Sequence, residues 1–169
     1  MAATVVLQQL TGAGPTATDI TDSPLLFGAD DSYNAGDTYP VKRPSVGSNY
    51  SYETTLRAYA SGAFTSLSSW KFYMDGANGL GSGLGLEVKA IAQGSYAQAT
   101  GTQGETASQM AGGSDAFGYT SAAPLDLTGS ISSAGAGTVQ YLRFQASVTS
   151  ASTPGDSSSE NSVTQWDES

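Results

Sequence analysis

The stretch VQYLRFQASV, residues 139–148, decides the fold class. Leu142, Phe144 and Val148 alternate in it with polar residues such as Arg143. A period of two places one face of a β-strand against a core and leaves the other face in water. The stretch therefore predicts a strand with one buried apolar face and one exposed polar face.

Further segments outside this stretch also favour β-structure. They are residues 4–10, 50–58, 67–74, 84–90, 125–127 and 163–166. Asp75-Gly76 and Asn78-Gly79 follow the third of these segments, and such pairs favour tight reversal of the chain. The spacing predicts one hairpin over residues 67–92 and a second, with a long loop, from 139–148 to 163–166. No window has the apolar period and cap of a helix.

These segments predict an all-β chain in one domain, residues 1–169. Short strands separated by turn residues are typical of an antiparallel β-sandwich, either jelly-roll or Ig-like. Two stretches, 11–37 and 93–124, are long and irregular for a compact domain, so they are expected to be functional, disordered, or ordered by a neighbour.

Composition excludes several classes of protein. Val, Leu, Ile and Phe make up about a sixth of the chain, and the net charge is −9, which approaches a disordered composition. Nine Tyr, two Trp and the alternating pattern argue against disorder. Six basic residues are too few for a nucleic-acid surface. The lack of Cys and His excludes disulfides, thiolate metal sites and the commonest general base.

The same sequence indicates neither a membrane protein nor a secreted precursor. No run of about 18 apolar residues has the length of a membrane span. Residues 1–10 hold no basic residue before their short apolar stretch, so they do not form a signal peptide. We expect a protein made in the cytoplasm, or one whose leader has been removed.

Carboxylates offer the main route to catalysis or metal binding in this chain. Asp75 and Glu87 could form a glycosidase pair, but a turn role for Asp75 and a solvent-facing Glu87 are the favoured interpretation. Asp30, Asp31 and Asp37 could bind calcium, yet their spacing does not match the twelve-residue calcium loop. We therefore predict no catalytic residue, no metal site and no cofactor.

The stretch 93–124 supplies the candidate interface. Its only large apolar side chains are Tyr96, Met110, Phe117 and Tyr119. Four such residues are too few to offset a backbone ordering cost of about 1 kcal/mol per residue. The stretch is therefore expected to be mobile in an isolated subunit, with these four side chains as anchors on a neighbour.

Four short motifs carry a resemblance to a known family. They are FTSL (64–67), WKFYMDG (70–76), YLRFQ (141–145) and TQWDE (164–168). In style they resemble small β-sandwich virion structural proteins of tailed bacteriophages, over about a third of the chain. The resemblance implies a non-enzymatic subunit that decorates or cements a capsid, or that sits in the neck or tail. Its partners would be other virion subunits, in a homo-oligomer or a capsid or tail lattice.

A carbohydrate-binding module is the alternative, because such modules are also β-sandwiches. Trp70, Tyr73 or Trp166 would then stack on sugar rings. Trp70 alternates in register with Phe72 and Met74, which favours core packing for this residue.

Overall fold

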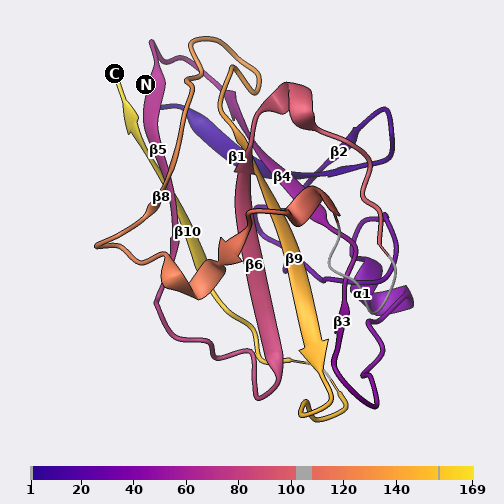
Figure 1. Ribbon diagram of the computed structural model, residues 1–169. Helices are drawn as coiled ribbons and strands as arrows, with labels where there is room; N and C mark the ends of the chain where they lie inside the picture. Colours follow the sequence, from indigo (N-terminus) through magenta and orange to yellow (C-terminus); the bar gives the residue numbers. More distant parts are fainter. Residues whose placement is uncertain (1, 102–107, 156) are drawn as a thin grey trace.

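The computed structural model describes residues 2–101, 108–155 and 157–169. Ten strands alternate with short helical turns and long loops (Figure 1). The strands are β1 (Thr4–Thr11), β2 (Thr16–Asp19), β3 (Ser48–Tyr50), β4 (Thr54–Ser61), β5 (Leu67–Met74), β6 (Leu84–Ile91), β7 (Ser114–Asp115), β8 (Leu125–Leu127), β9 (Tyr141–Thr149) and β10 (Ser162–Glu168). The helical turns are α1 (Ala35–Thr38) and the 3-10 turns η1 (Gln93–Ser95), η2 (Ser108–Met110) and η3 (Ala116–Gly118).

Two antiparallel sheets pack against each other. The large sheet has the order β2-β1-β4-β9-β6-β7, with β3 also paired to β9. The small sheet has the order β10-β5-β8. In Figure 1 the small sheet lies on the left, the large sheet in the middle, and the segments carrying α1 and β3 on the right. This arrangement confirms the predicted all-β sandwich.

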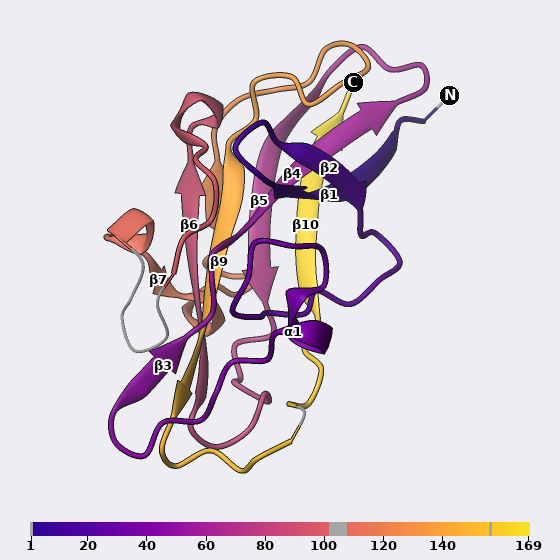
Figure 2. The same ribbon diagram turned by 90° about the vertical axis from the view of Figure 1, so that its right-hand side faces the viewer.

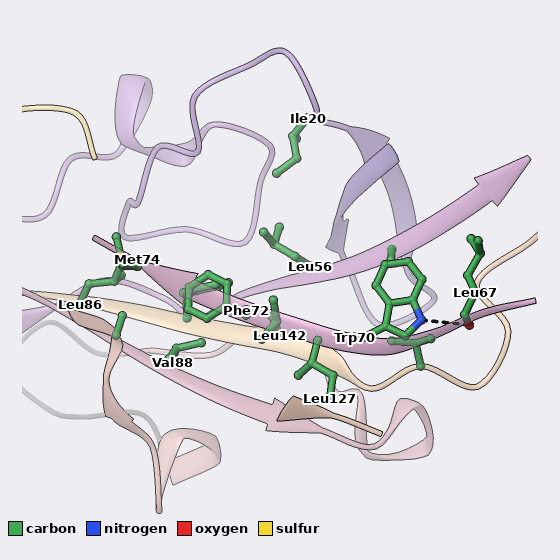
Figure 3. Packing of buried hydrophobic residues seen from close by; sticks show 14 of the residues in the cluster. Ile20, Leu56, Leu67, Trp70, Phe72, Met74, Leu86, Val88, Leu127 and Leu142 are labelled. Atoms are coloured by element: carbon green, nitrogen blue, oxygen red, sulfur yellow. Dashed lines mark hydrogen bonds between the residues drawn. The ribbon is translucent and has the colours of Figure 1, made fainter. Parts of the chain in front are cut away.

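The core lies between the two sheets (Figure 3). Alternate side chains of β5 enter it, and Trp70 and Phe72 are each 1 % exposed. The ring of Phe72 meets the ring of Phe144 edge to face at 5.4 Å. The large sheet contributes the apolar residues of its inner face, among them Leu56, Leu86, Val88, Leu142 and Phe144. For Trp70, Phe72, Leu142 and Phe144, the sequence alternation had predicted this inward placement correctly.

A bulge in β5 explains why Leu67 and Trp70 both face the core although they are three residues apart. Ser69 has a positive φ of 54°, and the pairing of β5 with β10 shifts register at this point. An extra residue in one strand turns the following side chains to the other face. The Trp70 indole N–H then donates to the Leu67 carbonyl at 3.2 Å.

Neither predicted hairpin forms. β5 pairs with β10 and β8, whereas β6 pairs with β9 and β7. The turn residues between them behave as expected, since Asp75 accepts from the Ala77 N–H at 2.9 Å. The connection over residues 75–83, however, crosses to the opposite sheet. β9 and β10 likewise belong to different sheets, because residues 150–161 make a second crossover.

β3 and β4 lie end to end along the same side of β9. Tyr50 pairs with Ser147, while Thr54 pairs with Phe144, so β3–β4 holds one residue more than β9 in between. The Ser51 hydroxyl fills the break by accepting from the Ala146 N–H at 2.9 Å. This bulge brings Glu53 onto the outer face of the large sheet, the face turned away from the small sheet.

Candidate functional site

The outer face of the large sheet carries an unusual set of polar side chains that are buried or, at Lys89, half-buried. We call this set the polar layer; its members are Glu53, Thr55, Lys89, Arg143 and Gln145. Glu53 is 3 % exposed, Arg143 is 2 % exposed and Gln145 is 1 % exposed. The polar face of β9 was predicted to lie in water, and that prediction is wrong.

Arg143 lies at the centre of the polar layer. Its Nε donates to Thr55 Oγ1 at 3.2 Å, within the sheet. Its two terminal nitrogens donate to Gln109 Oε1 and, at 3.2 Å, to the Ala97 carbonyl. Both of these acceptors belong to the segment after β6. One buried guanidinium therefore ties two separate parts of this segment to β9 and β4.

Two further members of the polar layer hold the same segment. Lys89 Nζ donates to the carbonyl of Ala111 at 2.6 Å and to that of Gln109 at 3.4 Å. Glu53 Oε2 accepts from the Thr100 N–H at 2.7 Å. These charge-assisted bonds link backbone groups of a loop to side chains of the sheet. The described residues on both sides of 102–107 are consequently bound to the outer face.

A close backbone contact shows how tightly this segment sits. A Cβ added to Gly101 would lie 2.6 Å from Tyr52 Cδ1, which is closer than real side chains approach. Only glycine permits that approach at position 101 without displacement of the tyrosine ring.

Burial dominates the electrostatics of the polar layer. It raises the pKa of Glu53, while hydrogen bonds from backbone N–H groups and the nearby Arg143 oppose the rise. The negative charge of Asp31 raises the pKa of Glu53 by a smaller amount. Burial also lowers the pKa of Arg143, against the attraction of Glu53. Glu53 Oε1 is buried without a hydrogen-bond partner in the described residues.

A small apolar cluster lies beside the polar layer. Leu10, Ile91 and Tyr141 form it, and Tyr96 packs against them. The Tyr96 hydroxyl donates to the Gly12 carbonyl at 2.7 Å. Burial raises the pKa of Tyr96 to about 12. This residue thus joins η1 to the turn after β1.

The other three candidate interface residues also pack within their own chain. Met110 is 1 % exposed and Phe117 is 5 % exposed. Tyr119 is half-buried against the main core, and its carbonyl accepts from the Met74 N–H at 2.9 Å. A role for these residues against a neighbouring subunit stays a prediction, but they do not need a neighbour to become buried.

The described parts of the stretch, residues 93–101 and 108–124, find partners in their own chain, whereas we had expected those partners on a neighbour. The expectation counted only large apolar side chains and treated the polar face of the sheet as wet. Charged side chains of that face instead bind the backbone of the loop. Residues 102–107, in the middle of the stretch, lie outside the described residues. The signal available in the sequence was the length of the loop, which must rest on some surface.

The structure does not bring Asp75 and Glu87 together as a carboxylate pair. Asp75 caps the turn after β5, in the small sheet. Glu87 lies opposite Gln145 on the outer face of the large sheet, which points away from the small sheet. The turn role proposed for Asp75 is confirmed.

The loop aspartates have mainly local partners. Asp31 Oδ2 accepts from the Gly12 N–H at 2.8 Å, and Asp37 lies in the single turn of α1. Asn34 Oδ1 and Gln9 Oε1 are buried without hydrogen-bond partners in the described residues. Within these same residues, no group of three or more acidic, His or Cys side chains is placed to bind a metal ion.

The aromatic residues considered for sugar stacking divide between core and surface. Trp70 is buried, as its alternation predicted, and Trp166 stacks on it with ring centroids 5.2 Å apart. Both indoles therefore serve the packing between β5 and β10. Tyr73 is half-buried beside Val163, its pairing partner on β10.

Comparison of the chain with family models, with curated proteins and with solved structures gave no match. Across the described ranges, no helix has the length and apolar character required to span a membrane.

Proposed function

We propose that the protein is a non-enzymatic structural subunit of a tailed-phage virion. Decoration or cementing of the capsid is favoured slightly over a position in the neck or tail. The protein would be made in the host cytoplasm, would reside in the virion and would act through contacts with other subunits.

The observation that carries the proposal is the use of buried charge in the polar layer. Arg143, Lys89 and Glu53 all bind backbone or side-chain groups of the segment after β6. Catalytic sites instead leave such groups facing a substrate cavity. Here they bind Ala97, Thr100, Gln109 and Ala111 to the face of the sheet, which suits a protein that presents shaped surfaces to neighbours.

The sequence resemblance supports the same class. Three of the quoted motifs fall mainly on β5, β9 and β10, which supply both sheets of the sandwich, and FTSL leads into β5. Both tryptophans of the carbohydrate-binding alternative are engaged with each other between β5 and β10. Of the three residues proposed to stack on sugar rings, Tyr73 is the one that does not take part in this contact between the two indoles.

The direct test is mass spectrometry of purified particles from the virus whose genome carries the gene. We expect peptides of this chain in a fixed ratio to a major capsid or tail protein. Absence of the chain from intact, infectious particles would contradict the proposal. Retention on an immobilised polysaccharide, lost on Tyr73→Ala substitution, would favour the carbohydrate-binding alternative.

A further inference from the structure

β10 is the longest strand at the edge of either sheet. It has seven residues, whereas the other described strands with a free edge along their whole length, β2, β3, β7 and β8, have four, three, two and three. Proteins usually protect long edges with Pro, Lys, a bulge or a covering segment. β10 contains neither Pro nor Lys, and its side chains at 162, 163, 165, 167 and 168 are exposed.

The hydrogen bonds show which backbone groups of β10 face away from β5. Ser169 and Ser66 exchange both of their backbone bonds, so Ser169 and Asp167 point toward β5. The Met74 N–H donates to Tyr119, on the β8 side of β5. The backbone N–H and C=O groups of Tyr73 and Lys71 therefore point toward β10, where these residues pair with Val163 and Gln165. Successive residues of a strand point to opposite edges.

The N–H and C=O groups of the remaining residues therefore line the free edge. They are Ser162, Thr164, Trp166 and Glu168. Within the described ranges, no segment other than β5 makes a backbone-to-backbone hydrogen bond to β10; the Ala3 N–H donates to the side chain of Glu168 at 2.9 Å. A row of alternating donors and acceptors recognises an extended strand of backbone.

We propose that this edge pairs with β10 of a second copy of the chain, antiparallel and centred on Gln165. In this register Thr164 meets Trp166 of the other copy, and Ser162 meets Glu168. The backbone groups of each of these residues point toward the free edge. Every N–H on that edge therefore donates to a carbonyl of the other copy. Thr164 and Trp166 both face the core, so the two small sheets join with their core faces on the same side.

Charge selects this antiparallel arrangement. The charged residues of β10 are Asp167 and Glu168, both at its C-terminal end. Pairing about Gln165 places Asp167 opposite Val163 of the other copy and Glu168 opposite Ser162. A parallel arrangement would bring like carboxylates together, which destabilises a strand pair. Val163 is 41 % exposed in the single chain, and the pairing covers part of it.

The interface is small, so the dimer is weak and depends on concentration. Two strand edges bury less area than the standard interface of about 1,600 Å². Each copy carries a net charge of −9, so the copies repel each other at low ionic strength. Association should consequently strengthen as NaCl is added, which is the reverse of a dimer held by ion pairs.

This inference does not depend on the virion assignment, because edge pairing is available to a protein of any role. The test uses single cysteines, since the chain has none of its own. Gln165 lies on the two-fold axis as a non-hydrogen-bonded pair, where Cα atoms are about 4.5 Å apart. That separation lies within the range of a disulfide. In the same register Val163 of one copy pairs with Asp167 of the other, so the two Val163 residues are four positions apart and too distant for a disulfide.

We expect Gln165→Cys to form a disulfide-linked dimer under mild oxidation and Val163→Cys to remain largely monomeric. Both substitutions lie on the exposed face of β10, so neither should prevent folding. Equal cross-linking of the two variants would overturn the proposal. So would a wild-type chain that stays monomeric at millimolar concentration in sedimentation equilibrium with high salt.

A charge variant separates dimerisation from folding. Gln165→Glu lies beside Lys71 in its own subunit, so the thermal midpoint should not fall. In the dimer two glutamates face each other, and the dissociation constant should rise about fivefold. Val46→Glu adds the same charge in a loop at a residue that is 84 % exposed, and it should raise the constant much less. Equal effects of the two variants would overturn the register.

Discussion

The inner and outer faces of the large sheet are both buried, but by different means. The inner face presents Leu142 and Phe144 to the small sheet, while the outer face presents Arg143 and Gln145 to other parts of the chain. Figure 2 shows the backbone after β6 passing beside the large sheet on that side. These residues alternate along a single strand. One strand therefore serves two layers, an apolar one that joins sheet to sheet and a polar one that joins sheet to loop.

The difference teaches how a chain with few large apolar residues can order long loops. An apolar contact is non-directional and needs a large partner surface. A guanidinium or ammonium instead binds a few acceptors at defined positions. Arg143 and Lys89 thus hold Ala97, Gln109 and Ala111, and these parts of the loop need little apolar area of their own.

The largest expected effect lies on the inner face. Phe72→Ala or Phe144→Ala should lower the free energy of unfolding by about 3 to 5 kcal/mol, because each ring is buried and the sandwich cannot collapse to fill the cavity. Urea unfolding followed by tryptophan fluorescence measures the change. A shift in midpoint as small as that of a surface substitution would show that this face is not the main core.

The next effect tests the outer face. Arg143→Met keeps much of the side-chain volume but removes the donors to Thr55, Gln109 and Ala97. We expect a loss of about 2 kcal/mol, since buried acceptors are left without partners. Amide exchange should quicken over residues 93–101 and 108–111 before it changes in β5.

Arg57→Met is the matched control for the Arg143 substitution. Arg57 lies on the same outer face but is only half-buried, over the ring of Tyr59 at 5.6 Å and bonded to Gln8. Its loss should cost about 0.5 kcal/mol. If the two arginine substitutions cost the same and leave the loop protected, the polar layer does not hold the segment after β6.

A smaller effect is expected at the edge of the polar layer. Tyr96→Phe removes the hydrogen bond to Gly12 and should cost about 1 kcal/mol. The wild-type phenol has its pKa raised to about 12 by burial, so the folded state favours the neutral ring. The contribution of this phenol to the free energy of unfolding is full below the unfolded pKa of about 10 and is lost as the pH rises toward 12. Alkaline spectrophotometric titration should show one late tyrosine that disappears in the variant.

The smallest effect concerns the charge of Glu53. Its folded pKa is raised by burial, so its protonated form favours folding. This contribution is full below the unfolded pKa and is lost as the pH rises through the folded pKa. Glu53→Gln keeps an acceptor for the Thr100 N–H and removes the buried charge. Compared with the wild type, the variant should lose less stability between acid and neutral pH, as measured by thermal unfolding at a series of pH values.

The local sequence determined the strands and their core faces. Alternation in residues 67–74 and 139–148 placed Trp70, Phe72, Leu142 and Phe144 in the core, because side chains of a strand alternate between its two faces. Turn chemistry also held, as the Asp75 cap shows. These features depend on neighbours in the chain, so they can be read from a single segment.

Only the tertiary structure decided which strands pair and what covers the polar face. A turn sequence ends a strand but does not choose between its neighbour and the opposite sheet, so both predicted hairpins became crossovers. Likewise, the alternation that marks Arg143 and Glu53 as polar does not reveal whether water or a distant loop will meet them. Arg143 meets Ala97 and Gln109, more than thirty positions away along the chain, and Glu53 meets Thr100, which is 47 positions away.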